Sequence, residues 1–192
     1  MASFDPASVL EAVAMPGDAI EVGRVLDAWG VKGWLKILPH SASPEALFSS
    51  RRWYLQPTER GARRFEGCLL ARVREPREHA DAIVARFDGI EDRGAAESLR
   101  GARIFVPRSS FPSTAKDEYY WVDLIGLDVV NREGVWLGQV RELLSTGPQT
   151  VLVLVDERGS KPVERMVPFV SAYVDHVDLP GRCIRVDWQP DY

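Results

Sequence analysis

Short apolar runs, separated by turn-forming or charged residues, recur along most of this 192-residue chain. Short runs that are rich in Val, Ile and aromatic residues and end at turn residues are typical of β-strands. In the first half the pattern predicts strands at residues 19–26, 34–38, 53–57, 65–73, 82–87 and 102–106. In the second half it predicts strands at residues 126–131, 135–144, 150–156, 165–170, 172–177 and 183–188.

Helical patterns are few and brief. Ser43 as N-cap and Pro44 at the first helical position predict a short helix that ends at Phe48. A second short helix is predicted for residues 93–99. Because strands dominate and no long helix connects them, the pattern favours closed barrels over a parallel α/β sheet. The predicted fold class is all-β, with two small β-barrels joined by a linker and a few short helices.

Two segments without a strand pattern divide the chain. Residues 107–118 contain two prolines and four Ser or Thr residues, a composition typical of a linker. We therefore expect a first barrel at residues 18–106 and a second at residues 119–192. Residues 1–17 predict a flexible leader with one weak helix, because prolines and a glycine frame a short apolar stretch.

Composition narrows the class of protein. No apolar run approaches the roughly 20 residues that a membrane helix needs. The first residues lack the positive cluster and long apolar core of a secretory signal, so we expect a cytoplasmic protein without a membrane partner. Cys68 and Cys183 lie far apart without Cys or His companions, which predicts reduced structural thiols and no metal site. No cofactor is predicted.

Charge is unevenly distributed over a chain whose net charge is -4. Residues 1–106 hold 15 basic and 15 acidic side chains, whereas residues 107–192 hold 9 basic and 13 acidic ones. Residues 51–77 hold eight arginines against three glutamates. Because planar guanidinium groups pair well with phosphate, Arg51, Arg52, Arg63 and Arg64 are candidate RNA contacts. The alternative is a solvated, arginine-rich hairpin.

Gly30-Val31-Lys32-Gly33 matches the G-x-x-G loop with which KH domains hold a nucleic-acid backbone. A KH loop joins two helices, however, and this one lies between two predicted strands. The pattern favours a tight turn in which Gly30 and Gly33 adopt positive φ angles and Lys32 lies at the tip. Lys32 stays a candidate RNA contact in either case.

Catalytic motifs are absent from the sequence. His40, His79 and His176 have no partner at metal-ligand spacing, and hydrolase, phosphate-loop and dinucleotide signatures are missing. Residues 175–178, Asp-His-Val-Asp, are open to two interpretations: the polar rim of an edge strand, or carboxylates that orient a histidine base. Without a recognisable nucleophile or base, the sequence predicts that the protein is not an enzyme.

Three adjacent aromatic residues, Tyr119, Tyr120 and Trp121, follow the predicted linker. In either a strand or a helical turn they point to different sides, so at least one of them faces outward. Tyr and Trp are frequent anchors of protein interfaces. The three residues are therefore candidate partner-binding residues, although the cluster also suits a role in pinning the linker to the second barrel.

Taken together, these segments resemble the RimM family of ribosome maturation factors. The first half is similar in Val22-Gly23-Arg24-Val25, in residues 29–37 (WGVKGWLKI), and in Ser43-Pro44-Glu45 with Leu47-Phe48. The second half is similar in residues 118–127 (EYYWVDLIGL), then in Leu137-Gly138-Gln139-Val140, Thr146-Gly147, Val167-Pro168-Phe169-Val170 and Val177-Asp178-Leu179. One departure is Pro148-Gln149-Thr150, where the family usually has a small residue and Asn-Asp.

The resemblance implies a translation-factor-like barrel followed by a PRC barrel. It also implies a non-enzymatic factor that helps to assemble the head of the small (30S) ribosomal subunit and to process 16S rRNA. The implied partners of this monomer are a ribosomal protein of the head, the immature 30S subunit and 16S rRNA, and the family's paired docking tyrosines correspond to Tyr119 and Tyr120. The alternative function is a PRC-barrel adaptor that binds another protein and has no ribosomal role.

Overall fold

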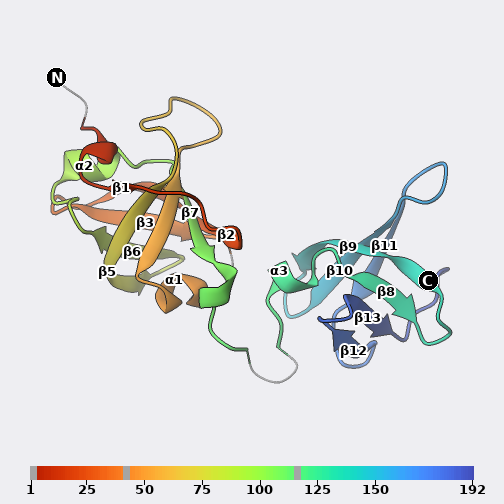
Figure 1. The fold of residues 1–192 in the computed structure, drawn as a ribbon. Coiled ribbons are helices and arrows are strands. Elements are labelled where there is room, and N and C mark those ends of the chain that lie inside the picture. Colours follow the sequence, from red (N-terminus) through yellow and green to blue (C-terminus); the bar gives the residue numbers. More distant parts are fainter. Residues whose placement is uncertain (1–3, 41–43, 115–117) are drawn as a thin grey trace. The chain divides into compact units, whose positions relative to one another are not determined.

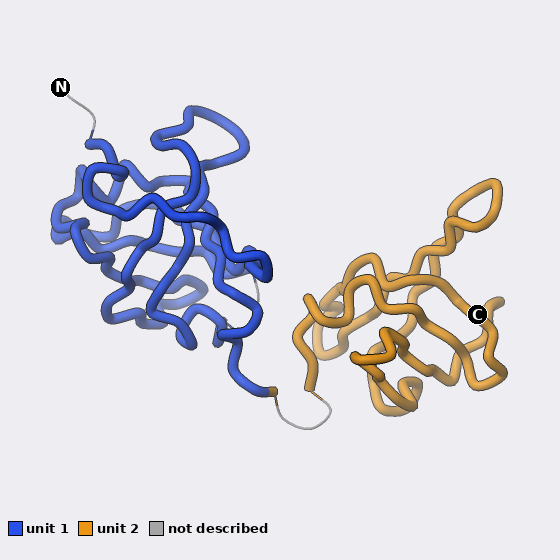
Figure 2. Tube along the Cα trace, in the orientation of Figure 1, with its two compact units in different colours: residues 1–113 blue, residues 114–192 orange. Residues whose placement is uncertain are grey.

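The structure, a computed structural model, describes residues 4–40, 44–114 and 118–192 (Figure 1). The chain divides into two compact units, residues 1–113 and 114–192, and each has its own apolar core (Figure 2). The division falls inside the segment predicted as a linker. Strands predominate in both units and the helices are short, which confirms the predicted all-β fold.

The first unit contains seven of the strands among the described residues. Its elements are η1 (Pro6–Ser8, a 3-10 helix), β1 (Glu11–Ala12), β2 (Ala19–Trp29), β3 (Trp34–Pro39), α1 (Glu45–Ser49), β4 (Arg52–Gln56), β5 (Leu69–His79), β6 (Ala82–Phe87), α2 (Arg93–Glu97), β7 (Arg103–Pro107) and η2 (Arg108–Ser110, a 3-10 helix).

Antiparallel pairing closes six of these strands into a barrel. The order is β5-β4-β7-β2-β3-β6, and β6 pairs again with β5. Successive side chains of a strand point to opposite faces, so every second residue enters the barrel. The core accordingly gathers apolar side chains from all six strands, with Trp53, Leu35 and Ile104 among the fully buried ones.

The strand β5 is longer than the sequence pattern predicted. The prediction ended at Val73, before the charged residues, whereas β5 runs to His79 because residues 73–79 pair with β6. A register shift between Arg74 and Arg77, with Glu75 at a φ of 49°, bends the strand there. Pro76 lies in this irregularity, where a missing backbone N–H does not interrupt a regular ladder.

The N-terminal segment differs from the predicted flexible leader over the described residues 4–17. β1 pairs with Leu69 and Leu70, on the edge of β5 that β6 occupies farther along, and Val13 N–H donates to the carbonyl of Cys68 at 3.0 Å. Leu10 is buried in the barrel core. Burial of this side chain and satisfaction of an exposed strand edge both hold the segment in place.

The first predicted helix corresponds to α1, whose first turn is closed by Leu47 N–H donating to the carbonyl of Pro44. Pro44 occupies the capping position and makes no side-chain cap bond. The predicted cap, Ser43, lies outside the described residues. The second predicted helix corresponds to α2, where the Asp92 carboxylate accepts from the backbone N–H of Ala95 at 2.8 Å.

The second unit is built on a six-stranded sheet. Its elements are α3 (Trp121–Leu124), β8 (Asp128–Asn131), β9 (Trp136–Ser145), β10 (Thr150–Asp156), β11 (Val163–Pro168), β12 (Val174–Asp178) and β13 (Cys183–Val186). The strand order is β11-β10-β9-β8-β13-β12, and β8 and β13 are parallel while the other pairs are antiparallel.

This sheet wraps around one core, because buried side chains from all six strands and from α3 belong to a single cluster. Its two edge strands, β11 and β12, are not paired with each other in the described part of the chain. The barrel therefore has a seam between them. In the turn of the β8–β9 hairpin, Asn131 Oδ1 accepts from the backbone N–H groups of Glu133 and Val135.

The turn between β2 and β3 has the predicted glycine conformations. Gly30 and Gly33 have φ angles of 73° and 74°, a region that favours glycine. A Cβ at Gly33 would lie 2.2 Å from the backbone oxygen of Ile90, whereas a Cβ at Gly30 would meet no atom within 4 Å. Gly33 thus lets the turn pack against the segment that precedes α2. Gly30 is required only for the positive φ angle of the turn.

We predict that Gly30→Ala and Gly33→Ala differ in their cost to stability. Both place alanine at positive φ, at roughly 1–2 kcal/mol each. Only Gly33→Ala also drives a methyl group into the Ile90 carbonyl, which adds about 1–3 kcal/mol of overpacking. Urea unfolding of the two variants measures the difference, and equal losses would show that the turn moves away from Ile90 without cost.

Candidate functional site

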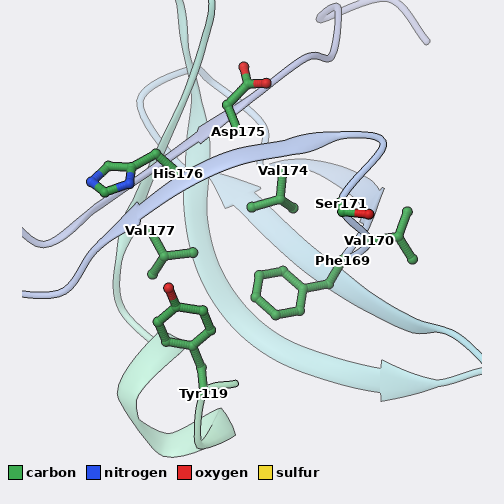
Figure 3. Close-up of a pocket in the computed structure, with 8 residues that line it drawn as sticks. All are labelled: Tyr119, Phe169, Val170, Ser171, Val174, Asp175, His176 and Val177. Carbon is green, nitrogen blue, oxygen red and sulfur yellow. The ribbon is translucent and has the colours of Figure 1, made fainter. Parts of the chain in front are cut away.

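Of the three adjacent aromatic residues, Tyr119 lies against the second core. Its ring contacts Phe169 edge to face, with centroids 6.2 Å apart (Figure 3). Tyr119 and Phe169 lie at the seam between β11 and β12, where they line a pocket of about 400 Å³ together with Val174 and Val177. Tyr119 therefore joins the chain that enters the second unit to its core, as one of the two interpretations of the cluster expected.

Trp121 has the opposite environment. It opens the one-turn helix α3, and its side chain is 45% exposed. Ile125 follows four residues later, where its N–H donates to the Trp121 carbonyl, and it is 47% exposed. Residues four apart share a helix face, so these two large apolar side chains form an outward pair. Leu124, fully buried between them in sequence, anchors the turn to the core.

Tyr120 lies between these two environments. It is half-buried, caps α3 in an extended conformation, and its carbonyl accepts from the N–H of Asp123 at 3.0 Å. The structure therefore assigns different environments to the three candidate partner-binding residues. Trp121 is the most accessible of them, and Ile125 is an accessible neighbour that the sequence analysis did not select.

The Asp-His-Val-Asp cluster lies on the edge strand β12. Asp175 receives two hydrogen bonds of 2.8 Å from the guanidinium of Arg132, which lowers the pKa of this carboxyl. Asp178 accepts from the backbone N–H of Gly181. Both carboxylates are thus engaged away from the exposed ring of His176. This arrangement matches the polar rim of an edge strand and does not orient a histidine base.

The candidate arginines separate into two groups. Arg51 and Arg52 lie at the start of β4 and line a groove of about 610 Å³ with Arg72 and Arg74 of β5. The predicted contacts Arg63 and Arg64 lie beyond the other end of β4, in the exposed β4–β5 loop, where Arg63 pairs with Glu66 at 3.7 Å. Lys32 is exposed in the β2–β3 turn. The sequence cluster is therefore not one surface.

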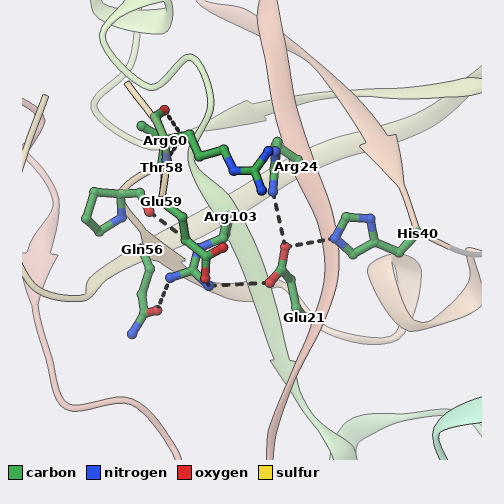
Figure 4. A network of polar contacts seen from close by, with 9 residues as sticks. Glu21, Arg24, His40, Gln56, Thr58, Glu59, Arg60 and Arg103 are labelled. Atoms are coloured by element: carbon green, nitrogen blue, oxygen red, sulfur yellow. Dashed lines mark hydrogen bonds and ion pairs between the residues drawn. The ribbon is translucent and has the colours of Figure 1, made fainter. Parts of the chain in front are cut away.

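A polar network holds the base of the β4–β5 loop on the barrel (Figure 4). Arg103 of β7, whose side chain is only 16% exposed, donates to Gln56 and Glu59 at 2.8 Å each and pairs with Glu21 of β2 at 3.5 Å. Glu21 also contacts His40 at 2.8 Å. Arg103 thus connects three strands to the loop that carries Arg63 and Arg64.

The turn in which this chain departs from the family pattern, residues 146–149, is closed by its backbone. Thr146 N–H donates to the carbonyl of Gln149 at 2.9 Å, and Gly147 has a φ of 79°.

Both cysteines are half-buried free thiols, and burial raises the pKa of the Cys68 thiol as well as that of Cys183. Raised pKa values disfavour the reactive thiolate form.

The sequence held signals for some of the residues that it did not single out. Ile125 is four residues from Trp121, and Arg72 and Arg74 alternate with buried residues, so each group shares a face. No local pattern in the sequence could indicate the pocket beside Tyr119. Phe169 and Val174 are far from Tyr119 in sequence, and only the pairing of strands brings them to it.

Family comparisons cover nearly the whole chain. Residues 20–111 match the RimM N-terminal domain, and residues 121–192 match the RimM PRC barrel domain. The ribosome maturation factor RimM of Paracidovorax citrulli is 67% identical over 186 residues, which are 96% of this chain and 97% of the relative. The protein of the same name in Acidovorax sp. (strain JS42) is 65% identical, over 96% of this chain and 97% of the relative.

A solved structure of a 16S ribosomal RNA processing protein RimM from Pseudomonas aeruginosa is 29% identical and covers 91% of this chain and 100% of its own. Because its TM-score of 0.44 is low, the family comparison depends on the sequence matches and not on this structure. No helix in the described residues is long and apolar enough to cross a membrane.

We predict that Arg103→Met loosens the β4–β5 loop. Loss of hydrogen bonds from a mostly buried guanidinium should lower the free energy of unfolding by about 1–3 kcal/mol. Trypsin should then cleave faster after Arg60, Arg63 and Arg64. Arg100→Met is the matched control, because Arg100 pairs with Asp27 at an exposed site and its loss should leave the free energy of unfolding close to that of wild type. Equal trypsin sensitivity of the two variants would contradict the assigned role of Arg103.

Proposed function

The chain belongs to the RimM family of ribosome maturation factors, and on that premise we propose that its second unit binds a ribosomal protein of the small-subunit head. Through this contact the protein assists assembly of the head and processing of 16S rRNA. The observation that carries the proposal is the outward pair of Trp121 and Ile125 on α3. Tryptophan is among the residues most often responsible for binding energy at protein interfaces.

The way α3 is held supports this role. Leu124 is buried below it, Gly126 N–H donates to the Val140 carbonyl at 2.7 Å, and the Arg182 guanidinium donates to the Gly126 carbonyl at 3.1 Å. A short element fixed at both its core side and its end loses little conformational freedom when a partner binds. Tyr119 and Tyr120 contribute by fixing the start of the element, and each of them retains an accessible part.

Charge supports a basic partner for the second unit. Residues 114–192 contain 8 basic and 13 acidic side chains, so this part of the chain carries the negative excess of the protein. Complementary charge speeds association and disfavours wrong partners. A protein that itself binds ribosomal RNA is expected to be basic. RNA contact by the first unit, through Lys32 and the arginines of residues 51–64, is the second component of the proposal.

Sucrose-gradient sedimentation of cell extract tests the proposed function. The protein should migrate with free small subunits or their precursors, and should be absent from translating ribosomes. A monomeric cytoplasmic factor that associates transiently would also leave a fraction at the top of the gradient. Confinement to the top fractions, even at low salt, would favour the alternative of a PRC-barrel adaptor without ribosomal function.

We predict that Trp121→Ala weakens binding to small-subunit precursors without unfolding the protein. Loss of one aromatic anchor should cost about 2 kcal/mol or more, near a thirtyfold loss of affinity, while the melting temperature stays close to wild type. Met166→Ala is the matched control, because Met166 is a 54% exposed apolar residue on the edge strand β11. The two variants are compared by sedimentation and by thermal unfolding.

Tyr119→Ala should behave differently from Trp121→Ala. Because its ring packs on Phe169 and the second core, its loss should lower the melting temperature in addition to any loss of binding. If Trp121→Ala binds precursors as wild type does, the outward pair is not the docking surface. If the Tyr119→Ala variant melts as wild type does, the tyrosine is a contact residue and not a core residue.

A further inference from the structure

A row of outward-facing side chains crosses the barrel of the first unit from β2 to β4. The strand registers place Trp29 opposite Trp34, Trp34 opposite Arg86, and Arg86 opposite Arg74. Two residues before Arg74, on the same face of β5, Arg72 lies opposite Arg52. We call this row the Trp–Arg track; its members are Trp29, Trp34, Arg86, Arg74, Arg72 and Arg52.

The alternation of burial confirms that the Trp–Arg track faces outward. Trp34, Arg86, Arg74, Arg72 and Arg52 each have a buried neighbour in the chain, among them Leu35, Ala85, Val73 and Trp53, and Trp29 follows Ala28, which packs against the core. The track crosses five neighbouring strands, β2, β3, β6, β5 and β4. At an interstrand spacing of about 4.8 Å, it extends roughly 19 Å along the sheet.

Two steps of the track place like charges directly opposite each other. Arg86 faces Arg74, and Arg52 faces Arg72. Like charges directly opposite each other destabilise a sheet, so folding alone does not favour this arrangement. Natural proteins keep arrangements that cost stability mainly where function needs them.

Acidic side chains neutralise this surface only in part. Asp88 forms an ion pair with Arg74, which lowers the pKa of Asp88, and Glu75 pairs with Arg77 at 2.7 Å. Within the described residues, Arg52, Arg72 and Arg86 form no ion pair. The groove of about 610 Å³ beside Arg52 and Arg72 is lined by four arginines and by two carboxylates, Glu75 and Asp88, so positive charge predominates in it.

The other end of the track is aromatic. Trp29 and Trp34 meet edge to face with centroids 5.9 Å apart, His79 lies 5.4 Å from Trp29, and the Arg77 guanidinium lies over Trp34. Trp29 is nevertheless 40% exposed. Lys32, in the turn that follows Trp29, is exposed as well. A partly exposed indole beside cations suits a flat ring on a negatively charged chain.

We propose that the Trp–Arg track binds single-stranded RNA, with phosphates on the arginines and an unpaired base stacked on Trp29. Neither part alone specifies this ligand: an acidic protein satisfies the arginines but not the indole, and an RNA duplex offers phosphates but no free base face. The inference rests on the proposed function, since it names the kind of RNA that the first unit meets in the immature subunit.

Fluorescence anisotropy of a labelled oligouridylate with the full-length protein tests the track. Trp29→Ala should weaken binding at least about fivefold, and Trp29→Phe should retain most of the affinity because it keeps an aromatic face. The same sequence in a duplex should bind more weakly than the single strand. Polyglutamate should compete poorly with the labelled RNA for the wild-type protein. In the Trp29→Ala variant, which lacks the indole, the affinity for polyglutamate relative to that for RNA should rise.

The arginines are tested by salt dependence and stability together. Arg52→Gln/Arg86→Gln removes one member of each like-charge pair, so the plot of log affinity against log salt should become shallower by about 1.4. Its melting temperature should equal or exceed that of wild type, because repulsion is relieved. Lys161→Gln/Arg185→Gln removes the same charge from the second unit and should leave the salt slope unchanged.

Each contrary result overturns the track. Equal weakening by the two double variants would show a response to net charge only, and a lower melting temperature of Arg52→Gln/Arg86→Gln would show that the arginines serve the fold. Unchanged RNA affinity in Trp29→Ala, or equal competition by polyglutamate, would exclude a stacked base. Failure of the wild-type protein to sediment with small subunits would overturn the proposed function, whereas failure of the wild-type protein to bind oligouridylate, with normal sedimentation, overturns the track alone.

Discussion

Closure of the first barrel by the pairing of β5 with β6 is the constraint on which that unit depends. β5 pairs with β4 through residues 69–72 and with β6 through residues 73–79, so one bent strand completes the ring. Closure removes sheet edges and fixes which residues point inward. It also places Arg74 opposite Arg86, on the two arms of the β5–β6 hairpin. The charged outer surface is thus a direct consequence of the register that buries the core.

The sheet of the second unit does not close, because its edge strands are not paired with each other in the described part of the chain. This opening determines which side chains the unit exposes. β11 and β12 form the edges of the sheet, and the seam between them is lined by Tyr119, Phe169 and Val177. The segment that enters this unit therefore has a core position to occupy. Once Tyr119 and Leu124 are in place, the intervening turn must present Trp121 to solvent. The exposure of one aromatic residue and the burial of another have the same cause.

The two units differ in chemistry in a way that suits a ribosomal substrate made of both RNA and protein. The first presents arginines, some without a carboxylate partner in the described ranges, and an accessible tryptophan. The second carries the acidic excess and an exposed apolar pair. Net charge does not reveal this difference, because acidic side chains elsewhere in the first half balance its arginines: residues 1–106 hold 15 basic and 15 acidic side chains. The proposed affinity for RNA therefore depends on one surface and not on the overall composition.

The sequence by itself determined the all-β class, the two-part organisation, most strands and the glycine turn, because these depend on local periodicity and on residues with restricted backbone preferences. It also marked the Tyr119–Tyr120–Trp121 segment as the place to look for a partner. Only the tertiary structure decided which of these aromatic residues packs against the core, since that depends on the seam formed by strands far along the chain. Likewise, alternation showed that Arg72 and Arg74 share a face, but strand register alone placed Arg52, Arg86 and the tryptophans beside them and separated Arg63 and Arg64 from them. Register depends on pairing between distant segments, and no local pattern specifies it.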